Sequence, residues 1–93
     1  PRTFLITPGP TATQQMLDAS VSAVPGDTIQ FDCGFFDLTQ PMQLANTENI
    51  LIKGCGKDLS FLSFKNSNQP IGIGAVNVRG LTVEDLTVLD TDG

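Results

Sequence analysis

The feature that most constrains the fold is a series of short apolar–polar alternations after Asp27. Each run has three to five residues and ends at Gly, Asn, Asp or Pro; the runs are Ile29–Phe31, Met42–Leu44, Ile50–Ile52, Leu62–Phe64, Val76–Val78 and Leu81–Val83. A period of two residues is typical of β-strands. No helical pattern separates the runs, which excludes strands joined by crossover helices and leaves a sandwich, a barrel or a solenoid.

The spacing of the runs favours the solenoid. Ile29–Phe31 and Ile50–Ile52 lie 21 residues apart, Met42–Leu44 and Leu62–Phe64 lie 20 apart, and the Cys-Gly pairs at 33–34 and 55–56 lie 22 apart. A third recurrence, at Leu81–Val83, comes after 31 residues, and we assign the excess to an outward loop over Asn66–Gly74. Two strands and a turn that recur together predict one coil of a β-solenoid, with neighbouring coils about 4.8 Å apart.

Residues 13–24 carry the one helical pattern. Leu17, Val21 and Val24 recur at i, i+4 and i+7, with Met16, Ala19 and Ala23 beside them. Thr11 and Gln14 have the spacing of a capping box, and Pro25-Gly26 ends the helix. A short apolar run, Phe4–Ile6, predicts a strand before it. We expect the apolar stripe of this helix to cover the open end of the first coil.

Composition narrows the classes of function. The chain has 93 residues, a formal charge of −5 and no histidine, tyrosine or tryptophan. That length predicts a single small domain over residues 1–93. The negative charge, with no basic cluster, argues against nucleic acid and against anionic membrane surfaces. No apolar run approaches the roughly 18 residues of a membrane span, so we expect none.

Several segments together resemble right-handed parallel β-helix proteins of the pectin-lyase-like group. Pro25-Gly26-Asp27-Thr28-Ile29, after a helix, resembles the N-terminal segment of that group, and Gly34–Leu38 resembles its step between coils, with Phe35 where threonine is usual. Asn49–Asp58 resembles its strand followed by Gly-x-Gly and Lys-Asp. Leu81–Asp92 is similar to a later coil of secreted bacterial β-helix repeat proteins.

The resemblance implies an all-β right-handed parallel β-helix of about three coils, with an N-terminal strand and capping helix. The cap covers residues 1–26 and the coils residues 27–93, as part of a longer solenoid. It implies a secreted or periplasmic location and the N-terminal portion of a carbohydrate-associated protein, non-catalytic in itself, whose partners are the rest of the β-helix and a polysaccharide.

Two alternatives stay open. One is a structural or assembly module whose open last coil docks onto another chain. The other is part of a polysaccharide lyase or epimerase whose catalytic residues lie outside this segment.

One concentration of carboxylates is a candidate metal site. In β-helix enzymes that act on uronates, the resemblance implies, carboxylates hold Ca²⁺; here the candidates are Glu84, Asp85, Asp90 and Asp92. Calcium needs about six to eight converging oxygens. The alternative is solvated carboxylates on outward faces and turns. No other cofactor is expected.

No catalytic residue is assigned. A lyase needs a base and an acid, and the only basic residues are Arg2, Lys53, Lys57, Lys65 and Arg79. The carboxylate pairs considered for glycoside hydrolysis are Asp32 with Asp37 and Glu84 with Asp85. Five asparagines are expected to stack along turns as structural residues: Asn46, Asn49, Asn66, Asn68 and Asn77.

The two cysteines, Cys33 and Cys55, allow either a disulfide or two buried free thiols. If they lie one coil apart, a strand spacing of about 4.8 Å falls within the Cα separation that a disulfide permits.

Overall fold

The computed structural model describes residues 1–69 and 71–89 of the chain. Over these residues it forms nine strands and one helix: β1 Thr3–Ile6, α1 Ala12–Ser22, β2 Thr28–Phe31, β3 Gly34–Asp37, β4 Met42–Glu48, β5 Leu51–Lys53, β6 Ser60–Ser63, β7 Ile73–Arg79, β8 Thr82–Glu84 and β9 Thr87–Leu89. The predicted strands over Phe4–Ile6 and Val76–Val78 fall within β1 and β7.

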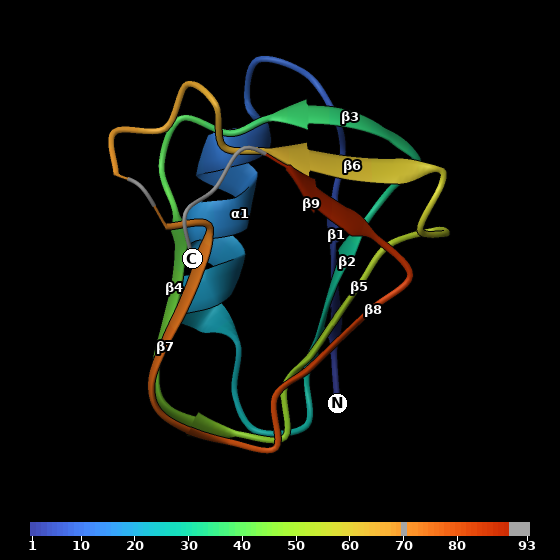
Figure 1. Ribbon diagram of the computed structural model, residues 1–93. Helices are drawn as coiled ribbons and strands as arrows, with labels where there is room; N and C mark the ends of the chain where they lie inside the picture. Colours follow the sequence, from blue (N-terminus) through green and yellow to red (C-terminus); the bar gives the residue numbers. More distant parts are fainter. Residues whose placement is uncertain (70, 90–93) are drawn as a thin grey trace.

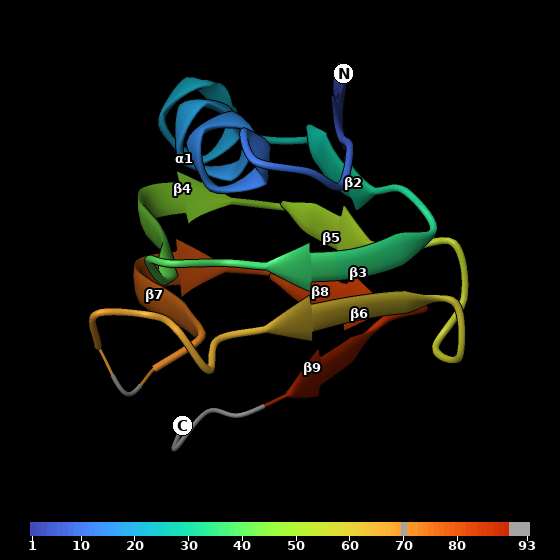
Figure 2. The same cartoon turned by 90° about the horizontal axis from the view of Figure 1, so that it is seen from above.

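The strands form three parallel sheets, because consecutive strands after α1 enter different sheets. The strand orders are β1-β2-β5-β8, β3-β6-β9 and β4-β7. Figure 1 shows the three sheets around a common interior, with α1 beside β4. Figure 2 shows the same strands stacked in successive levels, with α1 and the N-terminus at one end and β7, β8 and β9 at the other.

Side chains that point inward from the three sheets fill the interior. The first and third residues of four predicted runs are all buried: Ile29, Phe31, Met42, Leu44, Ile50, Ile52, Leu62 and Phe64. Phe31 and Phe36 meet edge to face, with ring centroids 5.2 Å apart. Alternation therefore assigns the buried face correctly in these four runs, whereas in the run Val76–Val78 the side chain of Val76 is 70% exposed.

The helix lies close to its predicted position, and its buried face overlaps the predicted stripe in part. Its buried residues are Ala12, Met16 and Ala19, whereas Val21 is 87% exposed and Val24 is 51% exposed. α1 packs against β4, β1 and β3, and alanine at two of the three contact positions lets the helix axis approach the strands closely. The predicted stripe is therefore correct at Met16 and Ala19, which are buried, and wrong at Val21 and Val24.

The start of the helix also differs from the prediction. Thr11 occupies the cap position without a side-chain bond to the backbone. Its Oγ1 instead accepts a hydrogen bond of 3.0 Å from Nε2 of Gln15. The Oε1 of Gln15 accepts from the backbone N–H of Thr7 at 2.9 Å, so Gln15 ties the end of β1 to the helix. The capping box with Gln14 is wrong.

The predicted class, an all-β right-handed parallel β-helix of about three coils, is wrong. The described residues form a small compact domain of three short parallel sheets and one helix, with extents of 28 × 24 × 21 Å. No elongated solenoid is seen in them. The physical reason is that the third sheet has only two strands. The helix packs on β4, where a further strand of that sheet would lie. The helix therefore takes the place of a strand at that side of the interior.

The pairing register also corrects the predicted repeat. Ile29 pairs with Ile52, two residues beyond the predicted Ile50. Met42 pairs with Ile73, inside the predicted outward loop, and Leu62 pairs with Phe36. Pairing of Ile52 with Val83 keeps the predicted offset of 31 residues. Turns of unequal length separate the strands, so similar residues at equal spacing need not be neighbours.

Candidate functional site

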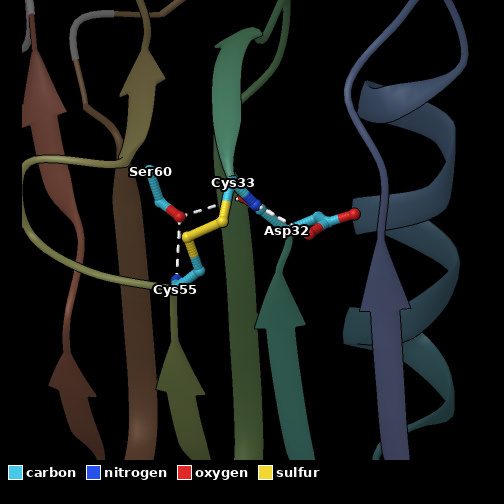
Figure 3. The surroundings of a disulfide bond; sticks show 4 residues. All are labelled: Asp32, Cys33, Cys55 and Ser60. Atoms are coloured by element: carbon cyan, nitrogen blue, oxygen red, sulfur yellow. Dashed lines mark hydrogen bonds between the residues drawn. A yellow bond between two sulfur atoms is a disulfide. The ribbon is translucent and has the colours of Figure 1, made fainter.

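Cys33 and Cys55 form a disulfide at the corner where β2 turns into β3 and β5 turns toward β6. Their Cα atoms lie 5.3 Å apart, and 22 residues separate them along the chain. Figure 3 shows the bond crossing between the two levels beside Asp32 and Ser60. The sequence allowed a disulfide or two free thiols, and the structure contains the disulfide. The bond links two segments whose flanking strands are already paired with each other, β2 with β5 and β3 with β6.

Ser60 holds this corner from the inside, where its side chain is fully buried. Its hydroxyl donates to the backbone oxygen of Asp32 at 2.9 Å and accepts from the backbone N–H of Cys55 at 2.9 Å. A Cβ added to Gly54 would lie 2.4 Å from the backbone oxygen of Asp85 and 2.7 Å from Cβ of Ser60. The corner is therefore packed backbone against backbone, and only glycine fits at position 54.

The candidate calcium ligands are only partly described. Glu84 ends β8 and Asp85 follows it, and both are exposed. Asp85 has a φ of 59°, so the chain turns there. Asp90 and Asp92 lie outside the described residues. Within residues 1–69 and 71–89, no three Cys, Asp or Glu side chains come together as a metal site would require.

The candidate catalytic groups lie apart. Asp32 precedes β3 and Asp37 ends it, so an extended strand separates the two carboxylates. Lys53 ends β5, Arg79 ends β7, and Lys57 and Lys65 are exposed. Among the described residues, these side chains do not gather round one cavity. Lys53 and Glu84 are the members of this set that occupy paired positions, on the neighbouring strands β5 and β8.

Two predicted asparagines do stack. Asn46 on β4 and Asn77 on β7 occupy corresponding positions, and both have a φ of 56°. Nδ2 of Asn77 donates to Oδ1 of Asn46 at 2.9 Å. Asn49, with a φ of 55°, precedes β5, and Gly80 stands at the same place before β8. These left-handed residues, which asparagine and glycine tolerate best, turn the chain between sheets at each level.

Asp27 is a buried carboxylate that the sequence did not single out. It is 1% exposed and accepts hydrogen bonds from the backbone N–H groups of Arg2, at 2.8 Å, and Val24, at 3.0 Å. The guanidinium of Arg2 pairs with it at 3.3 Å and also donates to the backbone oxygen of Ser22. These bonds fasten the N-terminal strand to the end of the helix.

The environment of Asp27 predicts a pH dependence of stability. The bond from the Val24 backbone N–H, followed by that from Arg2, holds the pKa of the Asp27 carboxyl below its ordinary value of 3.8. A lowered pKa means that this carboxylate stabilises the folded state fully above about pH 4. The contribution is lost as the pH falls through the folded-state pKa.

We therefore expect Asp27→Asn to lower the urea midpoint of unfolding at pH 6. The gap, which is the difference in midpoint between the parent chain and the variant, should shrink below pH 4. Urea titrations at several pH values measure this gap. Asp18→Asn, at an exposed helix position, is the control. A gap that stays constant from pH 6 to pH 2 would contradict the role of the ionised carboxylate.

The two ends of the stack differ in how well their apolar side chains are covered. At the helix end, Ile6 is 1% exposed and Met16 is fully buried. At the other end, Val83 is 44% exposed although it pairs with fully buried Ile52. We call this second surface the open face; its aliphatic side chains are Ile73, Val78, Leu81, Val83, Leu86 and Val88. β7, β8 and β9 are edge strands there.

Comparison with known proteins adds no identification. No protein-family model, curated protein or solved structure matches the chain. Over the part of the chain that the structure describes, no helix has the length and apolar character needed to cross a membrane. The resemblance to pectin-lyase-like proteins stays a prediction.

Proposed function

We propose that this chain is a non-catalytic structural module that is closed at one end by α1 and β1 and docks a further polypeptide at the open face. The observation that carries the proposal is the contrast between the fully buried Met16 at the closed end and Val83, which is 44% exposed at the other. Met16 belongs to the buried core, whereas Val83 remains exposed although it pairs in register with Ile52 of that core.

The proposed occupant is a polypeptide that adds strands parallel to β7, β8 and β9. Each of these strands already pairs in parallel on its other side, and an unpaired edge is a template for another strand. The stacked Asn46 and Asn77 show how one level is joined to the next by a hydrogen bond between side-chain amides. A matching segment would place aliphatic residues beneath Val83 and carry no net negative charge, because the chain itself has a charge of −5.

The proposal extends two predictions made from the sequence. A secreted or periplasmic location remains a proposal, which the Cys33–Cys55 disulfide supports because such bonds persist in oxidising compartments. Association with carbohydrate, and membership of a lyase or epimerase with catalytic residues elsewhere, remain predictions from the resemblance.

The test compares Val83→Lys with Val76→Lys. Val83 belongs to the open face, whereas Val76 is 70% exposed on the outward side of β7 and serves as the matched control. We expect the parent chain to enhance the fluorescence of anilinonaphthalene sulfonate, which binds exposed apolar surface. Val83→Lys should remove most of the enhancement, and Val76→Lys should keep it.

Sedimentation of the same samples shows whether the dye binds to the monomer. If Val83→Lys does not fold, Val83→Thr replaces it at the same position. Absence of dye binding to the folded parent chain, or an equal loss in the two lysine variants, would contradict the proposal.

A further inference from the structure

A second surface feature lies on the outward side of β3, away from the open face. Phe35 is 58% exposed there, because it alternates with the fully buried Phe36. It lines a hollow of about 400 Å³ with Gly9, Pro10, Thr13, Asp37 and Thr39. Phe35 and Asp37 are two residues apart on one strand and therefore point to the same side.

The walls of this hollow are fixed by contacts between three segments. The backbone N–H of Thr39 donates to Oγ1 of Thr13 at 3.1 Å, which ties the end of β3 to the start of α1. A Cβ added to Gly34 would lie 3.1 Å from Cγ of Pro8, so the loop before the helix packs closely on the start of β3. The hollow is therefore formed before any ligand arrives, as small-molecule sites commonly are.

Asp37 is oriented as a hydrogen-bond acceptor. Its Oδ1 accepts from Nδ2 of Asn66 at 3.0 Å, and Asn66 lies beyond the end of β6. A carboxylate has about four acceptor positions, and this bond takes one of them. Thr13 and Thr39 add hydroxyl groups that both donate and accept. An exposed aromatic ring thus stands beside a cluster of oxygen atoms.

This combination selects one chemical class of ligand. A ring face contacts apolar C–H groups, while the carboxylate and hydroxyls bind hydroxyl groups at the same time. A sugar ring presents both kinds of surface. Among the residues that the structure describes, no lysine or arginine lines the hollow, and the chain carries a charge of −5. A phosphate or a uronate would therefore meet a carboxylate without a compensating cation.

We propose that this hollow is a binding site for a neutral sugar residue, with Phe35 as the stacking platform and Asp37 as the acceptor for sugar hydroxyls. The site is independent of the open face, since it is built from β3, the start of α1 and the loop between β1 and α1. It requires no further chain and no catalytic group.

The test is a titration of the ¹⁵N-labelled 93-residue chain with cellotetraose, mannotetraose and tetragalacturonate, followed by amide chemical shifts. Amide shifts are the suitable readout because the chain has no tryptophan or tyrosine to report by fluorescence. At least one of the neutral tetrasaccharides is expected to shift the amides of Phe35, Asp37 and Thr39 at concentrations up to about 10 mM. Tetragalacturonate should shift them less.

Three variants complete the test. Phe35→Ala should weaken binding about tenfold through loss of the ring face, and Asp37→Asn about fivefold through loss of the charged acceptor. Val76→Ala, an exposed aliphatic residue on another sheet, should change affinity by less than about twofold. The proposal is overturned if neither neutral tetrasaccharide shifts these amides, if Phe35→Ala binds as tightly as the parent, or if tetragalacturonate binds as tightly as the neutral ligands.

Discussion

Reduction of the Cys33–Cys55 disulfide is expected to lower the free energy of unfolding by about 3 kcal/mol. The bond closes a loop whose ends lie 22 residues apart along the chain. Opening the bond increases the conformational entropy of the unfolded state and so lowers the free energy of unfolding. This loss of stability grows slowly with the length of the loop. A domain of this size has a total stability of only about 5–15 kcal/mol, so reduction removes a large share of it.

The measurement is a urea titration of the parent chain with and without a phosphine reductant. The control is the double variant Cys33→Ala with Cys55→Ala, whose midpoint should not respond to the reductant and should resemble that of the reduced parent. If oxidised and reduced chains have the same midpoint, the disulfide does not constrain the unfolded chain in the way proposed.

The second large effect is expected at the centre of the stack. Ile52 is fully buried and lies between Ile29 on β2 and Val83 on β8. Ile52→Ala removes buried methyl groups and leaves a cavity with neighbours on both sides, so it should cost about 2–5 kcal/mol. A urea titration under oxidising conditions measures this loss. A change below about 0.5 kcal/mol would mean that the centre of the stack is not closely packed.

The buried face of most strands could be predicted from the sequence because it depends on local alternation, although Val76 on β7 is an exception. Ile29 and Phe31 alternate with polar residues, and both are buried. The same signal was present at β3, where Phe36 and Leu38 are buried and Phe35 and Asp37 are exposed. Because the resemblance assigns this segment to a step between coils, the sequence predicts neither the strand nor the hollow beside it.

Partners across the sheets could not be predicted in the same way. Pairing depends on the lengths of all intervening turns, and the turn between β6 and β7 is longer than the turn between β3 and β4. Leu62 therefore pairs with Phe36 on β3, and Met42 pairs with Ile73. A hydrophobic pattern fixes which face of a strand is buried, and it contains no information on which strand lies next to it.

The buried face of the helix could be predicted only in part, since Met16 and Ala19 of the predicted stripe are buried whereas Val21 and Val24 are exposed. Large aliphatic residues mark a stripe in the sequence, but a helix that lies close to a sheet needs small residues at the contact. Ala12 and Ala19 provide that contact, and Val21 faces solvent. The ion pair of Arg2 with Asp27 could not be predicted from the sequence pattern either, because it joins residues from the two ends of the N-terminal segment.

The most direct test of the open face is the cost of Val83→Ala compared with that of Ile52→Ala in the same urea titration. Both side chains point into one interior and pair with each other in register. With Val83 left 44% exposed, its truncation should cost less than about 1 kcal/mol, well below the cost at Ile52. Equal losses at the two positions would show that Val83 is covered in solution, and would contradict an open face that awaits a partner.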